Sequence, residues 1–350
     1  MPEDRIRIVV VDDSALFRRL IRDVLREIPG CSIIGNAENG LRALEQISER
    51  RPDLITLDVE MPDMNGIDVL RELKRRGDST CAIMVSRLTD AGAQITTDAL
   101  LEGAFDFILK PAGRSPTENR AVLQAALEEK IAAFRHSAKA QGARAAGEAD
   151  IAEEKPSGGR YEVVLIGAST GGPEALREVL PKLPADFPVP VLVVQHMPPQ
   201  YTTQLARRLN DMCPLEVREA ENHTPVHPGT VLIAPGGRHM KVISHEDEAA
   251  TCLTDDPPEH SCRPAVDYLF RSAAEIWGSR TMGVVLTGMG QDGTDGCRRI
   301  GERGGYVIAQ SAEGCVVYGM PKSVIENSLS NRNFPLPSIA SGIIRRVKCG

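Results

Sequence analysis

The sequence predicts an α/β protein with two doubly wound domains joined by a linker. Short apolar runs rich in Ile, Val and Leu alternate with helical patterns along two long segments, which is typical of parallel sheets covered by helices. A segment with almost no large apolar residue separates them, and 350 residues are enough for two domains. We therefore expect a first domain at 1–130, a linker at 131–160 and a second domain at 161–350.

The first domain holds five apolar runs with the length of buried strands, at 6–11, 31–34, 53–57, 81–86 and 105–109. Amphipathic stretches lie between them, for example at 15–28 and 40–50. Strictly alternating strands and helices predict a five-stranded, doubly wound parallel sheet, because each crossover returns the chain to the same edge.

The second domain repeats the alternation, with apolar runs at 161–168, 189–196, 230–236, 280–288 and 304–310. These predict a second doubly wound, mostly parallel α/β sheet. The intervening segment is rich in Ala, Gly, Glu and Lys, so we expect it to be partly helical or disordered.

Composition excludes several classes of protein. The net charge of −7 argues against a general nucleic-acid binder or a partner of anionic membranes. No apolar run approaches the roughly 18 residues that a membrane span needs, and the N-terminus lacks the layout of a secretion signal. We expect a cytoplasmic, monomeric protein without membrane insertion. Its eight cysteines form no C-x-x-C pair, so we expect reduced thiols and no structural zinc.

Polar side chains follow four strands of the first domain. Asp12 and Asp13 follow the first strand, Asp58 the third, Ser86 the fourth and Lys110 the fifth. The carboxyl ends of parallel strands meet at one edge of the sheet, so these groups converge. Crowded carboxylates favour Mg²⁺, and a lysine and a hydroxyl beside them suit a transferred phosphoryl group.

This segment resembles the response-regulator receiver family over residues 5–130. The resemblance implies that a histidine kinase phosphorylates Asp58 and that Mg²⁺ is held by Asp12, Asp13, Asp58 and the backbone carbonyl of Glu60. It also implies that the Ser86 hydroxyl and the Phe107 ring are the switch residues, which shift when the phosphate is present. Lys110 corresponds to the invariant lysine of the family's phosphorylation site.

The second domain opens with "VVLIGASTGGPEAL", an apolar strand that ends in a glycine-rich turn before a helix. A serine replaces the middle glycine of a dinucleotide fingerprint, which argues against that type of site. The turn is instead typical of either an anion contact or an exposed nucleophilic serine, Ser169. His196 and Asp292 also follow strands, so a base and an orienting carboxylate can meet the serine.

Six blocks of this domain resemble the chemotaxis protein-glutamate methylesterase family, CheB. They are "IGASTGGPEAL", "QHMPPQYT", "APGGRHM", "CRPAVDYLFRSAA", "LTGMGQDGTDG" and "AQSAEGCVVYGMPK". The resemblance implies Ser169 as nucleophile, His196 as general base and acid, and Asp292 as the residue that orients it. It also implies an oxyanion hole from the amides of His196 and Met289, with Thr170 lining the site.

The same resemblance implies hydrolysis of glutamate methyl esters on chemoreceptors with release of methanol, and deamidation of receptor glutamines, without a metal in this half. It implies that the unphosphorylated receiver covers the active-site edge until Asp58 is phosphorylated. Two alternatives remain open from the residues: a non-catalytic adaptor that docks on receptors, and a serine hydrolase of another ester.

Overall fold

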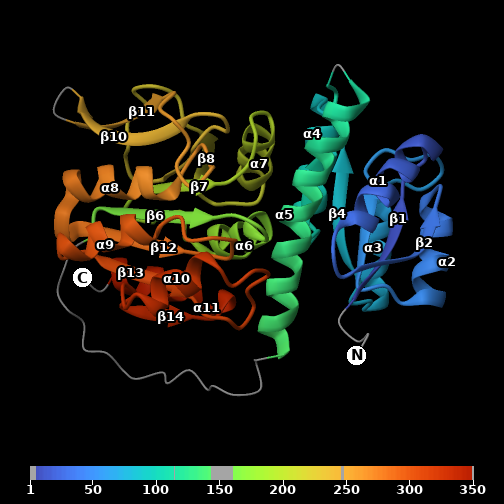
Figure 1. Cartoon of the computed structure of the whole chain (residues 1–350). Coiled ribbons are helices and arrows are strands. Elements are labelled where there is room, and N and C mark those ends of the chain that lie inside the picture. The colour runs from blue at the N-terminus through green and yellow to red at the C-terminus, as the bar shows by residue number, and fades with distance from the viewer. Residues whose placement is uncertain (1–4, 114, 143–160, 246–247, 349–350) are drawn as a thin grey trace. The chain divides into compact units, whose positions relative to one another are not determined.

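The computed structural model describes residues 5–113, 115–142, 161–245 and 248–348. The chain forms two compact units, Met1–Arg135 and His136–Gly350, and each contains its own parallel sheet (Figure 1).

The first unit has a five-stranded parallel sheet in the order β2-β1-β3-β4-β5, which confirms the predicted receiver architecture. Its strands are β1 (Ile6–Val11), β2 (Cys31–Ala37), β3 (Leu54–Asp58), β4 (Cys81–Ser86) and β5 (Asp106–Leu109). Its helices are α1 (Ala15–Glu27), α2 (Gly40–Arg50), α3 (Gly66–Arg76), α4 (Asp90–Leu101) and the start of α5 (Pro116–Gly142).

The helices of this unit begin where a short polar side chain caps the first turn. Ser14, Asn39, Asn65 and Thr89 each accept a hydrogen bond from a backbone N–H three residues later. Such caps satisfy amides that have no partner inside the helix. They fix where α1 to α4 start, directly after the loops that follow the strands.

Helix α5 extends into the segment expected as a linker, since it ends at Gly142. Phe134 packs edge-on against Phe105 with ring centroids 5.6 Å apart, so apolar contact stabilises this part of the helix against the sheet. The rest of the expected linker, 143–160, lies outside the described residues.

The second unit has a seven-stranded parallel sheet in the order β14-β13-β12-β6-β7-β9-β8 and a separate antiparallel hairpin, β10–β11. The strands are β6 (Val163–Ala168), β7 (Val191–Gln195), β8 (Glu216–Glu219), β9 (Thr230–Ile233), β10 (His239–His245), β11 (Glu248–Thr254), β12 (Thr281–Val285), β13 (Tyr306–Gln310) and β14 (Arg332–Phe334). The five predicted runs form its inner strands, whereas both edge strands and the hairpin were not predicted.

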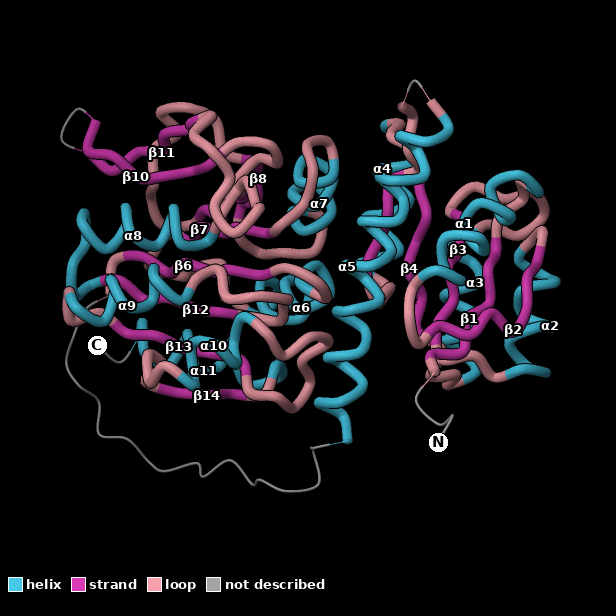
Figure 2. Tube along the Cα trace, viewed as in Figure 1, coloured by secondary structure: helices cyan, strands magenta, loops and turns pink. Residues whose placement is uncertain are grey.

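Helices of the second unit form two rows (Figures 1 and 2). One row contains α8 (Val266–Trp277), α9 (Thr294–Glu302) and α10 (Met320–Glu326); the other contains α6 (Gly172–Val179), α7 (Tyr201–Asn210) and α11 (Leu336–Lys348). Short 3₁₀ turns occur at Leu180–Lys182 and Gly278–Arg280. Phe270 of α8 is fully buried in the apolar core between the first row and the strands.

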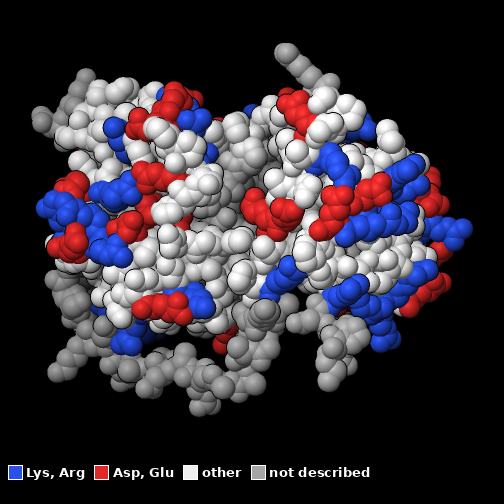
Figure 3. Space-filling view, viewed as in Figure 1, with Lys and Arg blue, Asp and Glu red and all other residues white. Residues whose placement is uncertain are grey.

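Charged side chains of both signs are interleaved over the face shown in Figure 3. On α3, for example, Glu72 pairs with Arg75 at 2.7 Å and with Arg76 at 2.6 Å. Exposed pairs of this kind contribute little to stability.

Candidate active site and receiver site

Ser169 follows β6 in a turn that glycines make possible. Its backbone N–H donates to the Thr287 carbonyl at 3.0 Å, and Gly171 has a left-handed φ of 76° as the cap of α6. A side chain at Gly172 would meet the Gln195 amide oxygen at 1.9 Å. The Gln195 amide nitrogen in turn donates to the Ser169 carbonyl at 2.9 Å, so the turn is held close to the next strand.

His196 lies beside Ser169 because their strands are in register. Ala168 pairs with Gln195 between β6 and β7, and the next residues are Ser169 and His196. The His196 backbone N–H donates to the Ala168 carbonyl at 3.1 Å. That amide therefore continues the strand pairing in this structure, and its contribution to an oxyanion hole stays a prediction.

Asp292 joins this pair from the loop between β12 and α9. Its Oδ2 accepts a hydrogen bond from His196 Nε2 at 2.8 Å and one from the Val266 N–H at 2.7 Å. Its Oδ1 accepts from the N–H groups of Asp267 and Gly293, both at 2.9 Å. Because the N-terminus of α8 supplies two of these donors, the carboxylate is stabilised in its ionised form.

The surroundings shift the pKa values of this pair in opposite directions. Burial opposes ionisation of Asp292, but the bonds from His196 and from the backbone hold the pKa of this carboxyl below its usual value. Burial also disfavours a charged imidazole, yet the contacts with Asp292 and Cys262 raise the pKa of His196 to about 9. The pair therefore favours an imidazolium beside a carboxylate.

The second imidazole nitrogen of His196 contacts a thiol. Cys262 Sγ lies 3.5 Å from Nδ1, whereas none of the hydrogen bonds within the described ranges joins Ser169 Oγ to this ring. Catalytic hydrogen bonds between nucleophile and base are often long before substrate binds. The structure thus brings the three predicted residues to one sheet edge and joins two of them, His196 and Asp292, by a hydrogen bond.

Met289 and Thr170 flank the serine. A Cβ placed on Gly288, the neighbour of Met289, would lie 2.7 Å from Ser169 Cβ, so this loop runs directly against the turn. Across the part of the chain that the structure describes, the Met289 N–H has no hydrogen-bond acceptor. The Thr170 carbonyl accepts from the Thr287 hydroxyl at 2.9 Å. Their roles in binding an oxyanion stay predictions.

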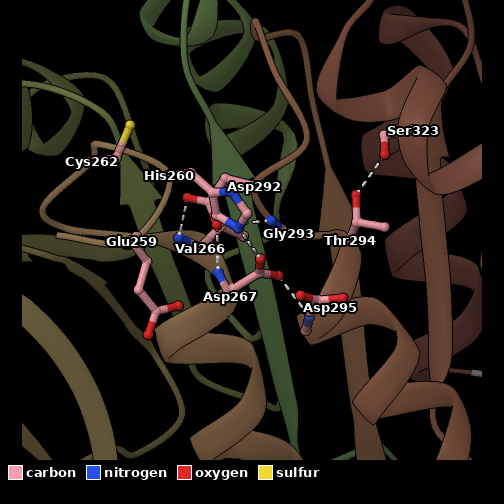
Figure 4. A network of polar contacts seen from close by, with 12 residues as sticks. Glu259, His260, Cys262, Val266, Asp267, Asp292, Gly293, Thr294, Asp295 and Ser323 are labelled. Atoms are coloured by element: carbon pink, nitrogen blue, oxygen red, sulfur yellow. Dashed lines mark hydrogen bonds and ion pairs between the residues drawn. The ribbon is translucent and has the colours of Figure 1, made fainter.

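Three residues near the site were not predicted from the sequence. Cys262 contacts His196, and His260 Nε2 contacts Asp267 Oδ2 at 2.9 Å beside Asp292 (Figure 4). Cys262 and Asp267 belong to the block "CRPAVDYLFRSAA", but no spacing rule assigns a role to a thiol in a turn or to an aspartate at a helix start.

The receiver site gathers at the carboxyl ends of β1, β3 and β5. Carboxylate oxygens of Asp12, Asp13 and Asp58 lie within 4.8 Å of one another. Lys110 Nζ lies 2.7 Å from an oxygen of Asp12 and 2.7 Å from one of Asp58. Burial raises the pKa of Asp58 to about 6 against the lowering effect of Lys110, and Asp12 adds to the rise. An oxygen donor set with excess negative charge fits a hard divalent cation such as Mg²⁺.

The remaining predicted receiver residues lie on β4 and β5 or directly after β3. Ser86 is fully buried and its hydroxyl donates to the Arg87 carbonyl at 3.2 Å. The Glu60 N–H donates to Asp58 at 3.4 Å, and Phe107 is half-buried on β5. Phe17, which was not predicted, places its ring 4.9 Å below the Lys110 ammonium, a cation–π contact that helps to hold the lysine.

Across the described ranges, every helix is too short or too polar to cross a bilayer.

Comparisons with known proteins agree with this geometry. The CheB methylesterase family model matches residues 164–343, and the response regulator receiver domain model matches residues 8–123. A protein-glutamate methylesterase/protein-glutamine glutaminase of Desulfotalea psychrophila is 45% identical, covering 98% of this chain and 99% of that one. The protein of the same name from Thermotoga maritima is 41% identical, covering 99% and 100%.

A solved structure covers the second unit. The crystal structure of the Thermotoga maritima CheB methylesterase catalytic domain aligns with a TM-score of 0.52 and 45% identity, over 53% of this chain and 98% of that one. Together, the two family models, the full-length relatives and the sheet-edge site show that the chain belongs to the CheB methylesterase family, with a receiver domain ahead of its catalytic domain.

Proposed function

We propose that this chain removes methyl groups from glutamate methyl esters of methyl-accepting chemoreceptors and deamidates receptor glutamines, under control of phosphorylation. It is a hydrolase of the class named by its relatives, protein-glutamate methylesterase/protein-glutamine glutaminase. The observation that carries the proposal is the 2.8 Å contact between His196 and Asp292 at the sheet edge where β6 presents Ser169. Neither a non-catalytic adaptor nor a hydrolase of unrelated esters is favoured by these names.

The chemistry follows from the orientation of the imidazole. An ionised carboxylate only accepts hydrogen bonds, so Asp292 keeps a proton on Nε2 and leaves Nδ1 as the basic nitrogen. We assign to Nδ1 the removal of the Ser169 proton as the serine oxygen attacks the ester carbonyl. The resulting imidazolium is stabilised by Asp292, and we assign stabilisation of the oxyanion to the Met289 N–H.

Collapse of the tetrahedral intermediate breaks the bond to the methoxy group. His196 gives its proton to the departing methoxide. Methanol leaves, and the acyl group remains covalently bound to Ser169. A water molecule then attacks, with His196 again as the base, and restores the serine with a free glutamate. An amide substrate follows the same steps with ammonia as the leaving group.

The receiver supplies regulation in this proposal. A chemotaxis histidine kinase would donate the phosphoryl group to Asp58. Asp12, Asp13, Asp58 and the Glu60 carbonyl would hold Mg²⁺, which would neutralise phosphoryl charge when bound. Lys110 contributes a fixed positive charge beside Asp58. Ser86 and Phe107 are the proposed switch residues that respond to the phosphate. We propose that the enzyme works in the cytoplasm as a monomer, on the receptors' cytoplasmic portions.

Methanol release from radiolabelled methylated receptors tests the function directly. The full chain, treated with a small phosphodonor and Mg²⁺, is expected to release methanol, and Ser169→Ala is expected to release none. No release from either chain would favour the adaptor. Hydrolysis of small esters by a chain that leaves methylated receptors intact would favour the other hydrolase.

A further inference from the structure

The turn Glu259–Cys262 has an unusual backbone. The Glu259 N–H donates to the Cys262 carbonyl at 3.1 Å, and the Cys262 N–H donates to the Glu259 carbonyl at 2.7 Å. The two residues between them, His260 and Ser261, have φ values of 50° and 62°. Left-handed backbone is unfavourable for residues other than glycine and persists where the surroundings hold it.

Contacts on both sides hold this turn. Nη2 of Arg271 on α8 donates to both carboxylate oxygens of Glu259, at 2.6 and 2.8 Å. His239 is fully buried and bonds both flanks of the turn: its Nε2 donates to the Pro257 carbonyl at 3.0 Å, and its Nδ1 accepts from the Ala265 N–H at 3.2 Å. These bonds fix the neutral tautomer of His239, so the turn has a rigid base.

His260 and Cys262, two side chains of this turn, contact different partners. His260 reaches the buried carboxylate of Asp267 at 2.9 Å, whereas the thiol of Cys262 points away from that carboxylate (Figure 4). Cys262 Sγ instead lies 3.5 Å from His196 Nδ1. The catalytic imidazole is thus contacted at both nitrogens, by Asp292 at Nε2 and by a thiol at Nδ1.

We propose that Cys262 is a positioning residue of the esterase: it holds the His196 ring in plane with Asp292 through Nδ1, the nitrogen that must receive the serine proton. This inference rests on the proposed function. A ring fixed at only one nitrogen can swing about that bond, and small misplacements of a base lower rates strongly. The rigid turn supplies the second fixed point until substrate brings the serine hydroxyl into line.

The contact also stabilises the charged ring, because a sulfur at this distance can accept a hydrogen bond from a protonated Nδ1. The groups that share this environment are few among the described residues. Asp292 contacts the ring, Asp267 and His260 lie beside Asp292, and Cys297 of α9 is buried near both carboxylates. Loss of the thiol alone therefore shifts the titration of the ring towards lower pH.

Three substitutions separate hydrogen bonding from bulk. Cys262→Val keeps the volume and loses the hydrogen bond, Cys262→Ala loses both, and Cys262→Ser keeps a hydrogen-bonding group in less volume. We expect kcat for methanol release by the phosphorylated full chain to fall about tenfold in the valine and alanine chains. The serine chain is expected to recover most of that loss. Cys252→Ala, a half-buried cysteine on β11, is the matched control and keeps the wild-type rate.

A second readout does not depend on catalysis. Ring ¹⁵N shifts of His196, followed against pH in chains that carry Ser169→Ala, report its protonation directly. The inflection is expected at lower pH in the valine and alanine chains than in their Cys262 parent. If Cys262→Ala prevents folding, Cys262→Val and Cys262→Ser are compared with the Cys262 parent instead.

The outcomes are distinct. Unchanged rate and unchanged ring titration in Cys262→Val would overturn the proposal, as would a valine chain that works while serine fails, because bulk alone would then explain the residue. Activity that survives Ser169→Ala but disappears in Cys262→Ser would make the thiol the nucleophile and also overturn it. A wild-type chain without methanol release would contradict the proposed function, while the ring titration would still decide the role of Cys262.

Discussion

The imidazole of His196 donates through Nε2 to Asp292 at 2.8 Å, and this carboxylate also accepts three backbone hydrogen bonds. The orientation of the ring is therefore set by a group that the backbone itself fixes. The arrangement follows from the parallel sheet, which brings loops from distant parts of the sequence to one edge.

Asp292→Asn is expected to lower methanol release by about a thousandfold or more, because a neutral amide neither stabilises the imidazolium nor selects the Nε2–H tautomer. Rates measured on methylated receptors would check this. Asp295→Asn is the control: Asp295 is exposed at the start of α9 and pairs with Arg298, so its loss should leave the rate unchanged. Equal effects of both substitutions would contradict the assignment.

The pH profile of kcat/KM should have an acid limb near pH 9. Only the neutral imidazole can accept the serine proton, and the pKa of His196 is raised to about 9. The rate should therefore fall as pH drops below that value and level off above it. An acid limb below pH 7 in initial-rate measurements would show that the imidazole is not charged in the resting enzyme.

Gly288→Ala should displace Ser169, because the two residues lie on neighbouring loops. The added Cβ would lie 2.7 Å from Ser169 Cβ and 2.4 Å from Met320 Sδ, so something must shift. We expect at least about a tenfold loss in kcat. Gly301→Ala on α9 meets nothing within 4 Å and should keep full activity, with a slightly higher melting temperature since alanine favours helices.

Removal of divalent metal should affect the receiver and spare the esterase. With EDTA present, a small phosphodonor is expected to give no increase in methanol release, because in the proposed function a divalent cation assists phosphoryl transfer to Asp58. The rate without phosphodonor should not change. Asp58→Asn should behave like the EDTA-treated wild type. A fall in the unstimulated rate with EDTA would instead indicate a metal in the catalytic half.

In the second unit, sequence patterns predicted the inner strands and missed both edge strands. β6, β7, β9, β12 and β13 are continuous apolar runs that are buried on both faces, so hydrophobicity alone identifies them. β8 reads "EVRE" and β14 has three residues, so neither carries that signal. The hairpin β10–β11 packs against α8 outside the main sheet, a tertiary contact that no local pattern encodes.

The site residues also fall into a group that the sequence predicted and a group that it did not. Ser169, His196, Asp292 and the receiver residues follow strands, so the topology rule of parallel sheets brings them together. Cys262, His260 and Asp267 come from a turn and a helix start, whose positions depend on His239 and Arg271. The His196 N–H donates to the Ala168 carbonyl just beyond the paired residues Ala168 and Gln195, a contact that strand-end reasoning did not predict.

Mass spectrometry can test directly whether Ser169 is the residue that attacks the ester. A reactive organophosphate ester, added in slight excess to the phosphorylated full chain, should release one leaving group per chain and leave its phosphoryl adduct on the peptide that contains Ser169. Ser169→Ala should show no adduct and no methanol release. An adduct on Cys262, or full methylesterase activity in the Ser169→Ala chain, would contradict the claim that Ser169, His196 and Asp292 perform the reaction.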